Sequence, residues 1–472
     1  MRRAALLALA ALGIACPARE AARPSPAASA RTSGSGVSVL LITIDTLRAD
    51  HLGGYGYARP TSPNFDALAA EGTLFEQAYT YWPKTRGSFV MMMTGRQPSR
   101  NGYSKTHPGV VDFNPTIASV LKAAGYRTAA VVDNPNVGRA HGYGKGFDAY
   151  RETWEETALA SEWDRTQAIT EDGTRFLAAA RPEAPFFLWL HYVNPHAPYA
   201  PPRPWDTRFA PEPGGKRLRV VESLRGGIPK QWAIAGKDRL ADYVALYDGE
   251  IAAVDAEVGR ILEALRRSAV RERTLVILTS DHGESLGEHD YYFDHGEDLF
   301  DPSLRIPLVV AAPGGARGRR SPFLASTLDL MPTILDAAQV SYPPELAGTS
   351  LMPDVRGGAP PPRDMLFAQN ERHLSAGFGR RFKVVAKPVG DATSFALYDR
   401  EADPGEVQDV SRAEAEALRS GRRELELFLE RADREWEKTR LLLGGAPQGE
   451  ARISKEACEK LRALGYVTEC SP

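Results

Sequence analysis

The sequence predicts an α/β protein in which helices flank a mostly parallel central β-sheet. Short apolar runs rich in β-branched and aromatic residues alternate with helical patterns along the chain, as in layered α/β folds. The runs carry few polar residues, which is typical of strands buried on both faces of a parallel sheet. We expect strands at residues 37–44, 128–132, 186–190, 274–279 and 306–311, and helices at 64–71, 116–124, 165–180 and 241–267.

Three of the predicted strands lead directly into loops that carry acids or histidines. The first strand (VSVLLITI) is followed by Asp45, FFLWL by residues 191–196 with two histidines, and TLVILT by Ser280, Asp281 and His282. Functional sites of such sheets lie at the carboxyl ends of the strands. The sequence therefore predicts a site at this edge.

Composition excludes two broad classes of protein. The 472 residues include 58 Lys and Arg against 60 Asp and Glu, a net charge of −2, so bulk charge does not attract a polyanion such as nucleic acid. A hydrophobic content of 43% with 25% charged residues is that of a folded globular chain, not a disordered one.

The first 36 residues predict an export signal and a tether. Residues 1–16 combine a short basic start with an apolar run, as in a signal peptide, and the run ends at Cys16 in a pattern that resembles a bacterial lipobox. Residues 17–36 are rich in Ala, Pro, Ser and Arg, a composition typical of a disordered linker. We expect a lipid-anchored protein of the periplasm or cell envelope; the alternative is plain secretion, with Cys16 lost on the cleaved peptide.

The remainder divides into a predicted catalytic domain, residues 37–364, and a smaller α+β subdomain with its tail, residues 365–472. Short segments with turns precede a charged helical stretch at 412–440 in the latter. Its cysteines, Cys458 and Cys470, allow two interpretations. They form a disulfide, which would stabilise the tail by roughly 3 kcal/mol, or they remain unpaired thiols.

The strand-end acids suit one divalent cation. Asp45, Asp281 and His282 would offer two carboxylates and an imidazole, a set that favours Mn²⁺ or Zn²⁺ and, less well, Ca²⁺. Two structural alternatives stay open: Asp45 could cap the following helix, and Asp281 could be a turn residue.

Seven segments of the chain occur together in a recognisable order. They are ITIDTLRADHLGGYGY, MMMTGRQPSR, FFLWLHYVNPHAPYAPP, YDGEIAAVD, LTSDHGESLGEHDYYFDHG with LRIPLVV, STLDLMPTILD and LYDREADPGE. In this order they resemble the signature segments of the sulfatase family of the alkaline phosphatase superfamily, over residues 37–409. The resemblance implies an α/β metal-dependent hydrolase of sulfate or phosphate esters.

The nucleophile position departs from that family. The Cys or Ser that sulfatases convert to formylglycine aligns with Thr85, and a family Arg aligns with Phe89. Threonine cannot become formylglycine. The site is instead similar to Thr-nucleophile branches of the superfamily, the nucleotide pyrophosphatase/phosphodiesterases and the phosphoethanolamine transferases. A metal would activate the Thr85 hydroxyl, a helix behind it at 87–94 would favour an anion, and Ser88 is the alternative nucleophile.

The resemblance also suggests substrate contacts. His196 and His295 align with residues that hold the ester oxygens; as alternatives they would ligate a second metal or be structural. Asn134 and Asn136 fall near a substrate loop, and Lys84 and Arg86 flank Thr85 as substrate contacts or solvated neighbours. His51, Arg48 and Asp50 are expected to position the Asp45 loop, whereas His191 and His289 receive no role.

The sequence thus predicts an exported hydrolase that forms a covalent intermediate on Thr85. Its substrate would be a small-molecule, glycan or lipid head-group ester, and nucleic acid is not an expected partner. The alternatives are a catalytically silent binding lipoprotein and a head-group transferase.

Overall fold

The computed structural model describes residues 36–341, 343, 345–360, 362–390, 392–444 and 453–470. The predicted signal peptide, Cys16 and all but the last residue of the predicted linker lie outside these ranges. Among the described residues, no helix combines the length and the apolar character that a membrane span requires.

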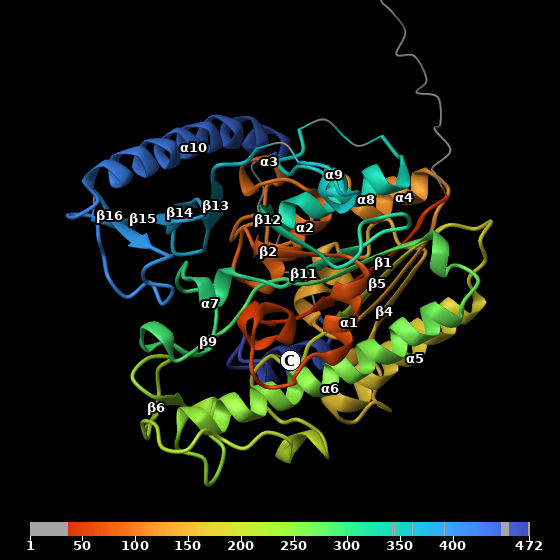
Figure 1. Ribbon diagram of the computed structural model, residues 1–472, viewed down its shortest axis with the longest axis horizontal. Helices are drawn as coiled ribbons and strands as arrows, with labels where there is room; N and C mark the ends of the chain where they lie inside the picture. Colours follow the sequence, from red (N-terminus) through yellow and green to blue (C-terminus); the bar gives the residue numbers. More distant parts are fainter. Residues whose placement is uncertain are drawn as a thin grey trace, which may run out of the picture. The chain divides into compact units, whose positions relative to one another are not determined.

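An eight-stranded sheet forms the centre of the described chain (Figure 1). Its strands, in spatial order, are β12 (Arg319–Ser326), β2 (Thr73–Tyr79), β11 (Leu308–Ala311), β8 (Thr274–Ser280), β1 (Ser38–Ile44), β5 (Phe186–Tyr192), β3 (Arg127–Val132) and β4 (Ala149–Glu152). Only β11 runs antiparallel to its neighbours within this sheet, so the predicted mostly parallel sheet is confirmed. All five predicted strands belong to it, whereas β2, β4 and β12 were not predicted.

Side chains of each buried strand point alternately to the two faces of the sheet, so helices pack on both faces. In β1, Val39 and Leu41 join the core that includes α2 (Thr85–Thr94), α4 (Ile117–Ala123) and α8 (Leu330–Ala338). Leu40 and Ile42 join the opposite core with α1 (Pro63–Glu71), α5 (Glu162–Ala179) and α6 (Leu240–Arg267). Predicted and observed bounds of α1, α4, α5 and α6 agree within three residues at each end.

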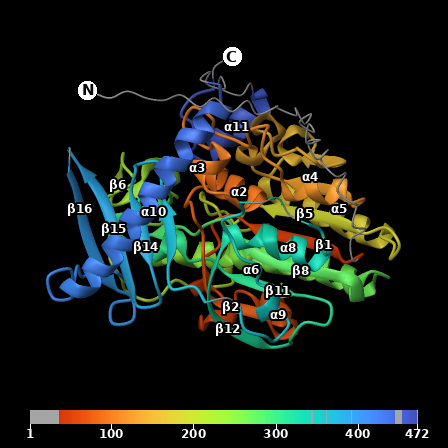
Figure 2. The same ribbon diagram turned by 90° about the horizontal axis from the view of Figure 1, so that it is seen from above.

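A second, antiparallel sheet forms the smaller C-terminal β-subdomain. Its strands β13 (Leu366–Gln369), β14 (Ser375–Phe378), β15 (Phe382–Val389) and β16 (Ala392–Asp399) follow one another in order. Helix α10 (Ala415–Leu442) lies along this sheet (Figure 2), where Phe428 stacks on Phe367 with ring centroids 4.1 Å apart. This helix corresponds to the charged stretch predicted at 412–440.

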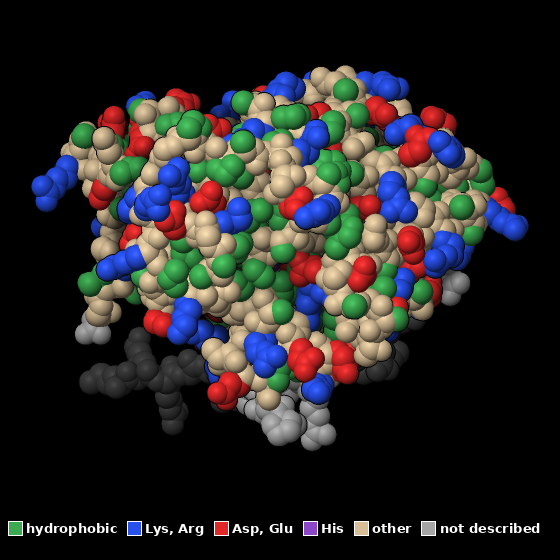
Figure 3. Space-filling model, turned by 90° about the horizontal axis from the view of Figure 1, so that it is seen from below, with side chains coloured by type: hydrophobic (Ala, Val, Ile, Leu, Met, Phe, Trp, Pro, Cys, Tyr) green, Lys and Arg blue, Asp and Glu red, His purple; other side chains and the backbone are tan. Residues whose placement is uncertain are grey.

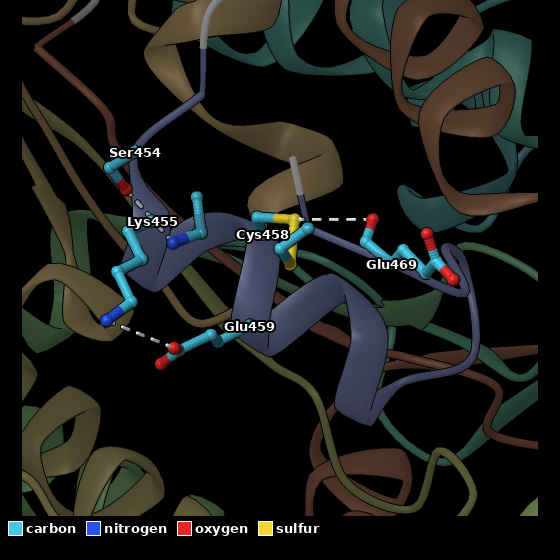
Figure 4. Close-up of a disulfide and its surroundings, with 7 residues drawn as sticks. Ser454, Lys455, Cys458, Glu459 and Glu469 are labelled. Carbon is cyan, nitrogen blue, oxygen red and sulfur yellow. Dashed lines mark hydrogen bonds and ion pairs between the residues drawn. A yellow bond between two sulfur atoms is a disulfide. The ribbon is translucent and has the colours of Figure 1, made fainter. Parts of the chain in front are cut away.

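Helix α11 (Lys455–Ala463) returns to the domain of the central sheet instead of extending the subdomain. It contacts the short helices η3 (Pro135–Val137) and η5 (Thr153–Glu155). Cys458 and Cys470 form a disulfide beside this helix (Figure 4), so of the two interpretations of these cysteines the structure shows the pair. By its contacts the tail therefore packs on the domain of the central sheet.

Short elements complete the fold. They are α3 (Pro98–Asn101), α7 (Asp301–Leu304), α9 (Met352–Val355), β6 (Val220–Val221), β7 (Ile228–Pro229), β9 (Ser285–Leu286) and β10 (Tyr292–Asp294). On the face shown in Figure 3, basic and acidic side chains are interspersed.

Candidate active site

The carboxyl ends of β1 and β8 bring Asp45 and Asp281 together. These strands pair in parallel with Ile44 opposite Ser280, so the next residue of each strand is an aspartate at the same level of the sheet. His282 follows, and one ligand atom of each of the three residues lies within 4.8 Å of the others. The predicted cluster is therefore assembled by the register of two adjacent strands.

The loop after Asp45 is fixed by contacts with the rest of the core. Thr46 has a left-handed backbone with φ of 54°, a costly conformation for a β-branched residue. The Tyr247 hydroxyl donates to the Thr46 carbonyl at 2.7 Å, and the Leu47 amide donates to the Ser280 hydroxyl at 3.1 Å. These bonds hold the chain in the turn that directs Asp45 toward Asp281.

The cluster has the chemistry of a cation site. Asp45 Oδ1 and Asp281 Oδ2 are buried without a hydrogen-bond partner among the described residues. His282 Nε2 lies 3.7 Å from the first and 3.2 Å from the second. Its Nδ1 lies 3.0 Å from the Gly283 carbonyl, which can only accept, so Nδ1 carries the proton and Nε2 presents a lone pair. The three residues fit a divalent cation.

Electrostatics supports the same conclusion. Burial raises the pKa of Asp281 to about 7, and burial together with the Asp281 charge raises the pKa of Asp45 well above its usual value. Burial lowers the pKa of His282 to about 3. Two carboxylates and a neutral imidazole are thus held where a positive charge would offset the cost of burying them.

Thr85 begins helix α2 next to this cluster. Its side chain is fully buried, and Oγ1 lies 3.1 Å from His282 Nε2. Helix α2 runs from Thr85 to Thr94, which confirms the helix expected behind this residue. Ser88, the alternative nucleophile, instead donates its hydroxyl to the Asp281 carbonyl at 2.8 Å.

A second buried cluster adjoins the first and contains His196, Glu284 and His295. The rings of His282 and His295 have centroids 4.1 Å apart. His196 Nδ1 lies 2.6 Å from the Ala197 carbonyl, so Nδ1 carries the proton and Nε2 presents a lone pair. His295 Nδ1 lies 3.4 Å from Glu284 Oε1. Burial lowers the pKa of His196 to about 4 and lowers that of His295 well below its usual value.

Tyr466, which sequence reasoning missed, reaches both clusters from the C-terminal segment. Its hydroxyl lies 2.9 Å from Thr85 Oγ1, 3.1 Å from His196 Nε2 and 3.4 Å from His295 Nε2. No motif or periodicity marks this tyrosine. Glu284 was also missed, although it stands in the DHGE stretch that the sequence analysis quoted.

The other predicted residues lie around this centre. Asn134 donates to Asp45 Oδ2 at 2.7 Å, and Asn136 accepts from Arg86 at 2.8 Å. Lys84 is more than a third exposed and lies 3.6 Å from Glu371.

The residues expected to position the Asp45 loop contact acidic side chains. Arg48 pairs with Asp50 at 2.7 Å, and His51 Nδ1 lies within hydrogen-bond distance of Asp248 Oδ1, at 2.7 Å. Of the two histidines without a predicted role, His191 lies 3.7 Å from Asp45 and His289 stacks on Phe300.

A two-carboxylate, one-imidazole cluster beside a buried hydroxyl at a helix N-terminus is an arrangement that suits hydrolases in which a metal activates an oxygen nucleophile. The family model "Sulfatase" matches residues 38–340, and the model "N-sulphoglucosamine sulphohydrolase, C-terminal" matches residues 287–431. The chain belongs to the sulfatase family and is a hydrolase of sulfate esters.

Individual relatives agree with this assignment. An arylsulfatase of Clostridium perfringens is 28% identical over 379 residues, covering 66% of this chain and 77% of that one. An N-acetylglucosamine-6-O-sulfatase of Bacteroides thetaiotaomicron is 23% identical, covering 79% and 82%. The crystal structure of a phosphonate monoester hydrolase of Agrobacterium radiobacter shares the fold, with a TM-score of 0.70, 24% identity and coverage of 84% and 96%.

Proposed function

We propose that this protein is an exported, metal-dependent hydrolase of sulfate or phosphate esters in which Thr85 is the nucleophile. The observation that carries the proposal is the position of Thr85 Oγ1, 3.1 Å from His282 Nε2 and beside the two aspartates. Threonine cannot be converted to formylglycine. The Thr85 hydroxyl itself would therefore have to form the covalent bond with the substrate.

Asp45, Asp281 and His282 would hold the cation, with Mn²⁺ or Zn²⁺ favoured and Ca²⁺ possible from the mixed oxygen and nitrogen donors. When bound, a divalent cation supplies positive charge that lowers the pKa of an adjacent hydroxyl. The chain itself supplies orientation. Asn134 fixes the Asp45 carboxylate, and the hydrogen bond to the Gly283 carbonyl fixes the tautomer of His282.

In the proposed reaction Thr85 Oγ1 attacks the sulfur or phosphorus atom and the ester oxygen leaves with its electron pair. The free N–H groups at the start of α2 favour the transferred anion. His196 and His295 direct ring nitrogens at the same space. Because burial keeps both imidazoles neutral, one of them would first take up the proton that the Thr85 hydroxyl loses, then bind an oxygen of the ester and pass the proton to the leaving oxygen. Water then attacks the same sulfur or phosphorus atom, so that the bond to Thr85 Oγ1 breaks, the Thr85 hydroxyl is restored and free sulfate or phosphate leaves.

The residues of the site favour a phosphate ester as substrate, whereas the family favours a sulfate ester. Because Thr85 cannot become formylglycine, the usual mechanism of sulfate ester hydrolysis is not open to this site. The phosphonate monoester hydrolase of Agrobacterium radiobacter supports phosphorus chemistry on this fold. The arylsulfatase and the N-acetylglucosamine-6-O-sulfatase support an aryl or glycan sulfate. A small-molecule, glycan or lipid head-group ester is therefore the proposed substrate class.

His196, Glu284 and His295 suggest a second role. Their ligand atoms also lie within 4.8 Å of one another, and both imidazoles are kept neutral by burial, the form that ligates metal. A second cation at this cluster is therefore an alternative to direct contact of the histidines with the ester.

The test is turnover of Thr85 variants on matched aryl sulfate, phosphate monoester and phosphodiester substrates. Thr85→Ala should lower kcat by several powers of ten with little loss of metal, whereas Thr85→Ser should keep partial activity. Ser88→Ala is the matched control and should stay near wild type, because its hydroxyl is bonded to a backbone carbonyl. Wild-type turnover of Thr85→Ala would disprove the covalent mechanism.

A further inference from the structure

The side chain of Tyr466 extends from the surface to the nucleophile. The residue is partly exposed, whereas Thr85, which its hydroxyl contacts at 2.9 Å, has no exposed surface. His196 and His295 are only 3% exposed. While Thr85, His196 and His295 stay buried in this way, a substrate ester cannot reach Thr85.

The Tyr466 hydroxyl uses the atoms that an ester oxygen would need. His196 Nδ1 is engaged by a backbone carbonyl, so Nε2 is the ring nitrogen left for a ligand, and it faces Tyr466 at 3.1 Å. His295 Nε2 faces the same oxygen. Burial raises the pKa of Tyr466 well above its usual value, so this oxygen is a neutral hydroxyl. One oxygen atom thus contacts the proposed nucleophile and both proposed ester-binding imidazoles.

We propose that residues 453–470, which we name the C-terminal latch, are a built-in occupant of the ester-binding site. The Tyr466 side chain takes the place of the transferable group, and substrate binds when the latch is released. This inference rests on the proposed function of the same site and adds its regulation: the enzyme competes with its own substrate.

Several contacts hold the latch in place. Lys460 is buried and pairs with Glu162 at 2.7 Å and with Asp133 at 3.2 Å. Three apolar side chains of the latch are buried as well: Ala457 and Leu461 of α11, and Leu464 directly after it. Gly465 has φ of +76°, and a Cβ there would lie 2.6 Å from the Trp232 ring. Glycine therefore lets the chain turn against Trp232 and present the next residue, Tyr466, to the site.

The disulfide closes the loop that carries Tyr466. Cys458 lies on α11 and Cys470 beyond the tyrosine, 12 positions apart, with Cα atoms 5.7 Å apart. Figure 4 shows the bridge beside α11 and the Cys458 contact with the Glu469 carbonyl. Because a cross-link restricts the open forms of the loop it closes, the disulfide favours the latched state, and its reduction should loosen Tyr466.

The first test measures binding rather than turnover. Inorganic phosphate is titrated calorimetrically into the metal-loaded full-length protein and its variants. Tyr466→Ala should bind phosphate about tenfold more tightly, the effect of a latch that is closed roughly nine-tenths of the time. Arg462→Ala, an exposed residue of the same helix, should match wild type. Equal or weaker binding by Tyr466→Ala would overturn the proposal and would make Tyr466 a residue that assists the reaction.

Two further variants guard against a folding defect. Tyr466→Phe keeps the ring but loses the hydroxyl, so its affinity for phosphate should rise by less than that of Tyr466→Ala. Cys458→Ser should shift affinity in the same direction, and a thiol reductant should reproduce the effect in wild type but not in this variant. An unchanged affinity after reduction, with the disulfide shown to be open, would contradict the role of the disulfide in the latch.

The latch and the nucleophile can fail separately. If Thr85→Ala keeps full turnover while Tyr466→Ala still binds phosphate more tightly, the nucleophile is wrong and the latch stands. If Thr85→Ala is inactive while the phosphate affinity of Tyr466→Ala equals that of wild type, the mechanism stands and the latch is wrong.

Discussion

The side-chain amide of Asn134 donates a 2.7 Å hydrogen bond to Oδ2 of Asp45. This bond leaves Oδ1 as the Asp45 oxygen with no hydrogen-bond partner among the described residues. The sequence predicts that Asn134 lies near a substrate loop, and that role stays a prediction. In the structure its amide instead orients Asp45, a proposed metal ligand. A role in substrate binding and a role in orienting the metal ligand predict different effects of a substitution.

Asn134→Ala should weaken metal binding by about 10- to 100-fold, the usual cost of removing a residue that orients a ligand. Competition with a chelator measures this affinity. Asn136→Ala is the matched control, because its side-chain oxygen accepts from Arg86 instead, and it should leave metal affinity unchanged. If Asn134→Ala raises KM with metal affinity intact, the residue binds substrate.

Asp281→Asn should lower bound metal and turnover together, by about 10²-fold or more in affinity or activity. The amide removes the charge of an oxygen that faces His282 at 3.2 Å. Metal content of the purified variant is the direct measurement. Asp172→Asn, whose carboxylate pairs with Arg151, should retain its metal. An unchanged metal stoichiometry in Asp281→Asn would remove that residue from the site.

His191 should make the protein sensitive to acid. Its Nδ1 lies 3.0 Å from Thr43 Oγ1, and burial lowers its pKa to about 3. The depressed pKa means that the folded state takes up this proton less readily than the unfolded chain, whose histidine titrates near 6.5. The stabilisation is therefore complete above about pH 6.5 and is lost as the pH falls toward 3.

Urea unfolding at several pH values tests this contribution. In His191→Gln the free energy of unfolding should depend less steeply on pH between 4 and 6, by about 1.4 kcal/mol per pH unit. Lys216→Ala, a change at an exposed residue, should keep the wild-type slope. An identical slope in His191→Gln would show that the imidazole is not held neutral by the fold.

Export and anchoring are proposals that rest on the first 36 residues. Cys16→Ser should move the protein from the membrane fraction to the soluble fraction, because the lipid on this cysteine would be the anchor. Fractionation followed by immunoblotting measures the shift. A variant that stays with the membrane would show that the lipobox interpretation is wrong.

The parts of the fold that the sequence predicted are those with an unambiguous local signal. The central strand β1 is apolar at five of its seven positions, and parallel pairing then places Asp45 beside Asp281. Strand β2 was missed because Glu76 and Gln77 interrupt its apolar pattern, which does not distinguish it from a loop. Strand β12 begins with Arg319 and Arg320 and contains a proline, a combination that argues against a strand.

In the candidate site, too, the residues that could be predicted are those with a local signal in the sequence. Asp45, Asp281 and His282 follow strands, so local pattern and the parallel rule suffice to place them together. Tyr466 has no such signal. Its position depends on the path of α11, which is set by tertiary pairs such as Lys460 with Glu162, and tertiary pairs of this kind cannot be read from one sequence.

The contact between Thr85 and Tyr466 joins positions 381 residues apart, which has a consequence for biogenesis. Contacts this distant in sequence form late, since a long loop must be ordered before they are gained. During synthesis the metal ligands and the nucleophile emerge well before residue 466. Every nascent or truncated chain that ends before this residue therefore lacks the contact between Tyr466 and Thr85, and the centre with Tyr466 in place is one of the last features of the molecule to form.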